Sequence, residues 1–175
     1  MRPVATRWLR FGATVSLILL ALIPTDRERA FAVAPAPCKD GWWADFMLGS
    51  YHIHPYKHFD EVNPGVGAEC WFTSQWAASA GYFRNSLERP SFYAGALYAP
   101  PFLHWGWFRL SLMGGIISGY NYGNWGLGRN HTIGPVVAPI VMVDYKRVGA
   151  NFILIPPIPS DKLPFTIGFQ VKVKF

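Results

Sequence analysis

The last eleven residues, 165–175, constrain the fold of this chain most tightly. Large apolar side chains alternate there with small or polar ones, a period of two that indicates a β-strand. One face carries Phe165, Ile167, Phe169, Val171, Val173 and Phe175, and the other carries Thr166, Gly168, Gln170, Lys172 and Lys174. The pattern is typical of a strand between lipid and a wet interior. An amphipathic edge strand of a soluble sheet is the alternative.

The composition favours the lipid-facing strand. Hydrophobic residues make up 51% of the 175 and charged residues only 15%, against about 25% charged in a typical soluble domain. Beyond the N-terminus the sequence has no apolar run near the roughly 18 residues that a membrane-spanning helix needs. The apolar excess is therefore predicted to lie on strands, within a chain whose length suggests one domain.

The N-terminus has the three parts of a secretory signal peptide. Three arginines occur in the first ten residues, an apolar run follows at 11–24, and small residues form a cleavage site at 30–34. We expect residues 1–34 to be removed, after Ala32 or Ala34, during export to the bacterial outer membrane. Charged residues just before the site leave an uncleaved anchor as the alternative.

The same segment explains much of the positive charge. Residues 1–32 hold five of the 16 Lys and Arg and two of the 10 Asp and Glu, so the formal net charge falls from +6 to +3 without them. About half of the net positive charge that would support nucleic-acid binding thus belongs to the targeting signal. We expect no nucleic-acid partner.

The remaining sequence divides into eight strand-like segments separated by turn chemistry. They are residues 42–53, 64–72, 76–84, 91–99, 105–119, 134–143, 149–156 and 165–175. Long connections (54–63, 85–90, 120–133, 157–163) alternate with short ones (73–75, 100–104, 144–148). An antiparallel barrel with its loops at one end has this asymmetry. We therefore predict an all-β fold, an eight-stranded antiparallel transmembrane β-barrel of the outer-membrane type, formed by residues 35–175 as a single domain.

This topology places both cysteines at the end with the short turns. Cys38 precedes the first strand and Cys70 lies near that end of the second. Both survive cleavage of the signal peptide in an oxidising compartment, where pairing is allowed but not required. Their predicted proximity favours a disulfide.

The interior is predicted to be partly charged and partly apolar. Glu69 and Arg109 fall on inward faces, where opposite charges are tolerated and can pair. Segments 134–143 and 149–156 are apolar on both faces. That pattern fits simple packing in a narrow barrel, and it also fits a slot for an acyl chain.

A histidine and a serine fall at the predicted rim with the long loops. His52 ends the first strand, and Asn85 and Ser86 follow the third. A serine nucleophile needs a base within hydrogen-bond reach and the base needs orienting, but Asn-Ser is also ordinary turn chemistry. His52, His54 and His58 could bind a divalent metal, yet they lack a recognised ligand spacing. We expect no metal and no cofactor.

Seven short motifs then occur in one order along the chain. They are Tyr51-His52, Asn63-Pro64-Gly65-Val66-Gly67, Phe83-Arg84-Asn85-Ser86, Ala94-Gly95, Pro135 to Pro139, Ile155-Pro156 and the terminal aromatic Phe175. In this order they resemble the outer-membrane lipid A palmitoyltransferase (PagP) family, over roughly residues 48–175. Each motif is short, and their joint order carries the resemblance.

The resemblance implies a tilted eight-stranded barrel that takes up a phospholipid acyl chain and moves it to lipid A. It implies that His52 and Ser86 are the catalytic pair, with Asn85 in the place of the family's acidic residue. The phospholipid donor and the lipid A acceptor would be its partners. Phe175 would present the chain to the outer-membrane assembly machinery.

The resemblance also assigns residues that bind or admit the substrate. Pro64, Pro135, Pro139 and Pro156 would interrupt strand pairing, because proline has no N–H donor, and would let lipid enter from the side. Leu97 falls where the palmitoyl-selective enzyme has a glycine at the pocket floor, which implies a shorter acyl chain or no pocket.

Two non-catalytic functions are the alternatives. In one, the barrel is a surface-binding or structural protein whose loops 54–63 and 120–133 do the work. In the other, it carries a lipid or another hydrophobic ligand in the same slot without turnover.

Overall fold

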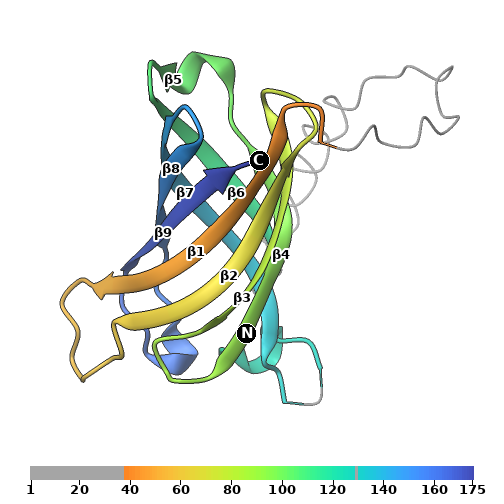
Figure 1. The fold of residues 1–175 in the computed structure, drawn as a ribbon. Coiled ribbons are helices and arrows are strands. Elements are labelled where there is room, and N and C mark those ends of the chain that lie inside the picture. The colour runs from red at the N-terminus through yellow and green to blue at the C-terminus, as the bar shows by residue number, and fades with distance from the viewer. Residues whose placement is uncertain (1–37, 129) are drawn as a thin grey trace, which may run out of the picture. The chain divides into compact units, whose positions relative to one another are not determined.

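A computed structural model describes residues 38–128 and 130–175, which form a closed β-barrel (Figure 1). Its eight long strands are β1 (Gly41–His52), β2 (Val62–Trp71), β3 (Trp76–Arg84), β4 (Pro90–Tyr98), β6 (Phe108–Ser118), β7 (Ile133–Tyr145), β8 (Val148–Ile155) and β9 (Thr166–Lys174). Neighbours pair antiparallel, and the β4–β6 pairing closes the barrel. The predicted all-β, eight-stranded antiparallel barrel is therefore confirmed.

Helical structure in the described residues is limited to three short 3₁₀ turns. These are η1 (Pro101–Leu103), η2 (Gly123–Trp125) and η3 (Pro159–Asp161). Within residues 38–128 and 130–175, no helix is long and apolar enough to cross a membrane. The predicted signal peptide, residues 1–34, lies outside the described residues.

The predicted fifth strand, 105–119, is broken near its start. A short strand, β5 (His104–Trp105), pairs with the first residues of β6 as a hairpin beyond the rim. Gly106 makes the turn with a φ of +60°, a conformation that glycine adopts without strain. The sequence pattern merges the two elements because apolar residues continue through the turn.

Long and short connections lie at opposite ends of the barrel (Figure 1). We call the end with connections 53–61, 85–89, 119–132 and 156–165 the loop end, and the end with 72–75, 99–107 and 146–147 the turn end. The predicted alternation of long and short holds at six of the seven connections. The 99–107 connection is longer than expected because it contains η1 and β5.

On β9, polar side chains point into the barrel and apolar ones point out. Along β9, Thr166, Gln170 and Lys172 are buried inside, whereas Val171 and Val173 are exposed. Each long strand has an exposed large apolar residue on its outer face, for example Phe46, Val66, Tyr82, Phe92, Leu112, Val137, Phe152 and Val173. The alternation predicted for the last strand is confirmed, and its apolar face is the outer one.

Ionic contacts fill the turn-end half of the interior, and we call them the charged plug. Lys172 Nζ lies 3.2 Å from Glu69 Oε2 and 3.1 Å from Asp144 Oδ1. Arg109 Nη2 lies 2.8 Å from Asp144 Oδ2. Glu69 and Arg109 do point inward, as predicted. They do not pair with each other, because Lys172 and Asp144 stand between them.

Aromatic rings complete the charged plug. The Arg109 guanidinium lies 3.9 Å from the centroid of Trp71, and Lys172 Nζ lies 4.7 Å from that of Trp43. Such cation–π contacts stabilise a charge that is removed from water. Cys38 and Cys70 form a disulfide at this end, with Cα atoms 5.0 Å apart.

Removal of Lys172 would leave the buried carboxylate of Glu69 and the half-buried carboxylate of Asp144 without their shared cation. We expect Lys172→Ala to lower the free energy of unfolding by about 3–5 kcal/mol, measured by denaturant titration of the refolded barrel. Lys39→Ala, in an exposed turn, is the control and should change it by less than about 0.5 kcal/mol. Equal effects of the two variants would show that the charged plug does not stabilise the barrel.

Candidate functional site

A cavity of about 490 Å³ occupies the loop-end half of the barrel. Its wall is mainly apolar and includes Phe83, Leu97, Met113, Ile117, Val136, Ala138, Ile140, Ile153 and Ile155. The β7 and β8 members of this set are the inward residues of the two segments predicted to be apolar on both faces. Those segments therefore line a space and are not fully packed against each other.

The floor of the cavity is polar except for Leu97. The lining residues nearest the turn end are Leu97, Glu69, Ser79, Asn151 and Gln170, the last two joined by a hydrogen bond of 3.2 Å. Leu97 is 1% exposed and is the lining residue of β4 that lies deepest. Leu97 is thus a buried residue of the cavity wall.

Two loops cover the cavity at the loop end. Tyr120, Tyr122 and Trp125 come from the 119–132 connection, and Ile158 and Leu163 come from the 156–165 connection. Burial raises the pKa of Tyr120 above its usual range. Burial, and then the Asp161 carboxylate, raise the pKa of Tyr122 to about 12. Both phenols therefore remain protonated at physiological pH.

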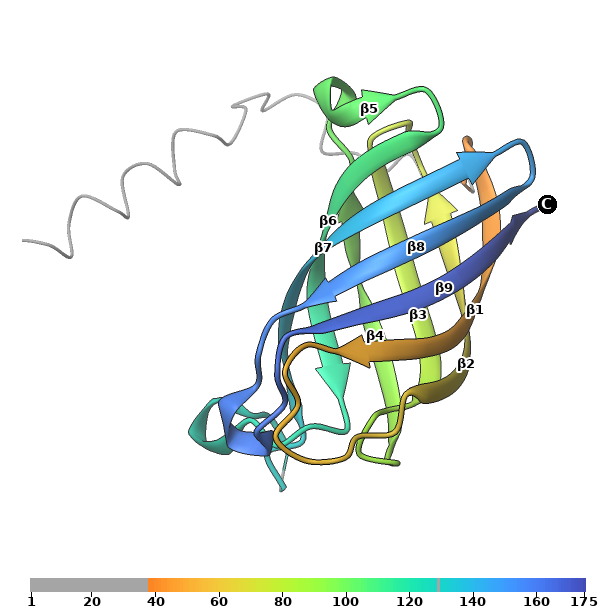
Figure 2. The same ribbon diagram turned by 90° about the vertical axis from the view of Figure 1, so that its left-hand side faces the viewer.

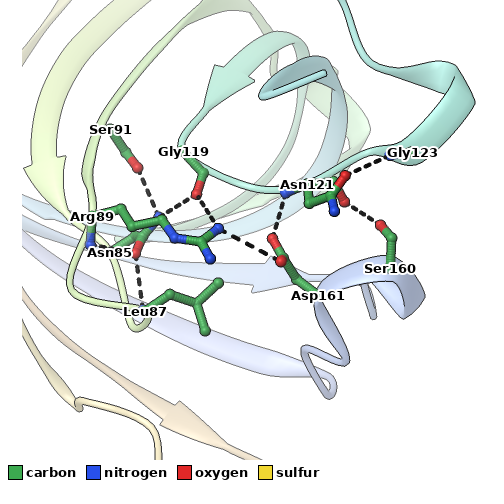
Figure 3. A network of polar contacts seen from close by, with 9 residues as sticks. All are labelled: Asn85, Leu87, Arg89, Ser91, Gly119, Asn121, Gly123, Ser160 and Asp161. Atoms are coloured by element: carbon green, nitrogen blue, oxygen red, sulfur yellow. Dashed lines mark hydrogen bonds and ion pairs between the residues drawn. The ribbon is translucent and has the colours of Figure 1, made fainter. Parts of the chain in front are cut away.

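Asp161 ties these loops to the β3–β4 turn (Figure 3). Its carboxylate lies 3.6 Å from Arg89 Nη1 and accepts a hydrogen bond of 2.5 Å from the backbone N–H of Asn121. The Ser160 hydroxyl donates to the Asn121 carbonyl, and Arg89 donates to the Gly119 carbonyl at 3.4 Å. Three loop-end connections are thus held together above the cavity.

Three polar side chains meet at the mouth of the cavity. The Ser50 hydroxyl donates to Asn63 Oδ1 at 2.5 Å, and Ser50 Oγ lies 3.1 Å from Ser86 Oγ. All three are buried and line the cavity. We call Ser50, Asn63 and Ser86 the mouth cluster.

The structure does not bring His52 into contact with Ser86. His52 lines a second hollow, of about 420 Å³, under the β1–β2 connection. Its ring stacks on Phe59 with centroids 4.7 Å apart, and Nδ1 lies 4.0 Å from Glu61 Oε1. Within the described part of the chain, neither ring nitrogen has a hydrogen-bond partner. Direct proton transfer between Ser86 and His52 therefore requires movement of the ring or of the 53–61 connection.

Asn85 is held by four hydrogen bonds, none of which involves the predicted histidine (Figure 3). Its Oδ1 accepts from the backbone N–H groups of Leu87 and Arg89, at 2.9 and 3.0 Å. Its Nδ2 donates to Ser91 Oγ and to the Gly119 carbonyl, at 2.9 and 3.0 Å. Gly119 has a φ of +88°, and an added Cβ would lie 2.8 Å from Asn85 Nδ2. In this arrangement Asn85 shapes the turn and does not orient a base.

The predicted prolines lie where pairing between β7 and β8 is interrupted (Figure 2). The β7–β8 ladder runs only from Ile140 to Tyr145. Residues 133–139 of β7, which include Pro135 and Pro139, pair with β6 alone among the described strands. Pro156 follows the last residue of β8. The sheet therefore has an unpaired stretch beside the apolar cavity wall.

Pro64 lies at a second irregularity, between β1 and β2. The register of this pair shifts between Met47 and Gly49, opposite the start of β2. A proline cannot donate to the ladder there. Pro64 thus lies at an irregular point of the β1–β2 pairing.

Ser50 and Asn63 are site residues that the sequence interpretation missed. Asn63 was visible only as the residue before Pro64, and Ser50 as a small residue near His52. The signal for Ser50 was its separation of two residues from His52, which places both on the same face of a strand.

No three or more His, Cys, Asp and Glu side chains of residues 38–128 and 130–175 are grouped to hold a metal ion. No protein-family model matches the chain, and no curated protein matches it. Its function must therefore be inferred from its motifs and its geometry.

Substitution of Asn85 by aspartate, the residue type of the resembled family, tests the role of this side chain. An aspartate cannot donate to the Gly119 carbonyl and would place an oxygen against it, so we expect Asn85→Asp to cost about 1–3 kcal/mol of folding free energy. Asn124→Asp, on an exposed part of a loop, makes the same change of charge and is the control. A fully stable Asn85→Asp variant with faster acyl transfer would instead favour an orienting role.

Proposed function

We propose that this chain is a barrel of the bacterial outer membrane that binds a phospholipid acyl chain and transfers it to lipid A or hydrolyses it. The observation that carries the proposal is the apolar cavity of about 490 Å³ with a buried serine cluster at its mouth. An apolar tube with a polar entrance fits an amphiphile, whose chain enters and whose ester stays at the entrance.

The apolar outer surface of the barrel supports a location in a lipid bilayer. A soluble protein rarely exposes contiguous apolar patches of more than a few hundred Å², and here each long strand has apolar residues facing out. The strands β1, β6 and β7 have 12, 11 and 13 residues, which suffices for the roughly 9–11 residues of a membrane-spanning strand.

Aromatic residues near the turn end support the same placement. The Trp76 and Tyr98 rings pack in a tilted arrangement with centroids 4.5 Å apart, and Trp107 meets Tyr145 edge-on at 5.0 Å. All but Tyr98 are exposed. Tryptophan and tyrosine favour the interface between lipid and water. The exposed terminal Phe175 is proposed to present the chain to the outer-membrane assembly machinery.

Acyl transfer would use Ser86 and His52 in two steps. Ser86 Oγ bonds to the ester carbonyl carbon while its proton passes to His52, and the lysophospholipid leaves with that proton. A hydroxyl of lipid A, or water, then gives its proton to His52 and takes the acyl group, and Ser86 regains its hydrogen. Lipid would reach the cavity through the unpaired stretch beside residues 133–139 of β7.

The test is acyl transfer from a labelled phospholipid to lipid A by the detergent-refolded protein. We expect Ser86→Ala and His52→Ala each to lower the rate by about 10²-fold or more. Ser74→Ala and His104→Ala, exposed near the turn end, are the matched controls and should keep the wild-type rate. An inactive wild-type barrel, tried with several chain lengths and with water as acceptor, would exclude the enzymatic function.

The deepest wall residue should set the length of the acyl chain. Leu97→Gly removes a side chain from the floor, so we expect the variant to prefer a longer acyl chain than the wild type does. Competition between phospholipids of different chain length measures the preference. An unchanged preference would show that the chain does not reach Leu97.

Lipid carriage without turnover is the second candidate, and the separation of His52 from Ser86 favours it. In that case the refolded wild-type protein would bind labelled phospholipid and release it unchanged. The Ser86→Ala variant would bind the phospholipid as well as the wild type does. A surface-binding barrel would instead be supported if deletion of 54–63 or 120–133 abolished a cellular phenotype and Ser86→Ala left that phenotype unchanged.

A further inference from the structure

The hydrogens of the mouth cluster can be assigned from its distances. A serine hydroxyl has a single hydrogen, and that of Ser50 is donated to Asn63 Oδ1 at 2.5 Å. The contact of 3.1 Å between Ser50 Oγ and Ser86 Oγ must then use the hydrogen of Ser86. Ser86 is therefore the donor, and its lone pairs are left for a group in the cavity.

The side-chain amide of Asn63 has donor capacity to spare. Its Nδ2 has two hydrogens, and one of them points to the Asp60 carbonyl at the long distance of 3.4 Å. The second has no protein partner among the described residues. Asn63 is 3% exposed and lines the cavity. A buried N–H without a partner loses free energy unless a ligand or a water accepts it.

The cavity limits which acceptor can meet this N–H. An acyl chain that fills the apolar wall brings its carbonyl, the first polar group after the chain, to the mouth. A carbonyl oxygen accepts hydrogen bonds and donates none, which matches the free donor of Asn63. The lone pairs of Ser86 are suited instead to the electron-poor carbonyl carbon. We infer that Asn63 Nδ2 binds the ester carbonyl oxygen of the bound acyl chain, with Ser50 as the positioning residue that holds the Asn63 amide. This inference rests on the proposed acyl-chain binding.

The assignment separates two roles at the mouth. A hydrogen bond from Asn63 draws electron density toward the carbonyl oxygen and makes the carbonyl carbon more electrophilic. Ser86, joined to Asn63 through Ser50, offers a lone pair on the same rim. A side-chain amide that stabilises charge developing on a carbonyl oxygen contributes about 10²–10³ in kcat in other enzymes. A carrier would use the same contact to fix the position of the ester without reaction.

Infrared spectroscopy of a phospholipid with ¹³C-labelled ester carbonyls tests the contact without turnover. The probe is bound to the full-length refolded protein in a detergent that has no carbonyl group. We expect the bound carbonyl stretch of the wild type to lie at lower wavenumber than in detergent alone. It should return to the free position in Asn63→Ala and Asn63→Asp, and stay shifted in Asn124→Asp. Bound lipid with the same stretch in wild type and Asn63→Ala would overturn the inference and assign the free N–H to water.

Kinetics give a second, separate readout. If the wild type transfers or hydrolyses the chain, Asn63→Asp should lower kcat by about 10²-fold with KM within about threefold, because the apolar wall that binds the chain is unchanged. If the wild type binds lipid with a shifted carbonyl stretch but has no activity, the enzymatic function is contradicted. The inferred hydrogen bond from Asn63 to the ester carbonyl is then still supported. A wild type that binds no lipid would overturn both.

Ser50 has its own test because it acts through Asn63. Ser50→Ala should lose part of the infrared shift, and Ser50→Thr, which keeps a hydroxyl, should restore it. A general loss of folding would instead remove lipid binding in both variants. The mobility of the barrel on unheated gels reports whether each variant is folded. An unshifted stretch in Ser50→Thr with normal lipid binding would contradict the positioning role.

Discussion

A closed sheet of eight strands allows each side chain only two directions, and the rest of the structure depends on this constraint. Successive residues point alternately inward and outward, and the β4–β6 pairing gives each of the eight long strands a partner on both sides over part of its length. The interior of such a barrel is narrow, so an inward charge must find a partner there. Lys172 does so with Glu69 and Asp144.

The charged plug decides where the barrel can be hollow. Because ionic and aromatic contacts fill the turn-end half, the cavity is confined to the loop-end half. The loops tied by Asp161 cover it from above, and the unpaired stretch of β7 lies at its side. This geometry favours a ligand that enters through the side of the barrel over one that passes along the axis.

One irregularity in β1 creates the mouth cluster. Up to Met47 the odd-numbered residues of β1 face inward, and the register shift before Gly49 reverses this, so that Ser50 and His52 face inward. A β-bulge has this effect because it adds one residue to a strand. Without it Ser50 would face outward, and neither Ser86 nor Asn63 would have its present partner.

The sequence by itself determined the strands and their faces, because a period of two is a local property that turns and prolines delimit. It located all eight long strands to within about three residues, put Glu69 and Lys172 inside, and brought Cys38 near Cys70. Only the tertiary structure decided which inward residues meet. Glu69 pairs with Lys172, Asn85 holds a turn, and Ser86 meets Ser50 in place of His52. These contacts depend on register, tilt and a bulge, which no single strand pattern contains.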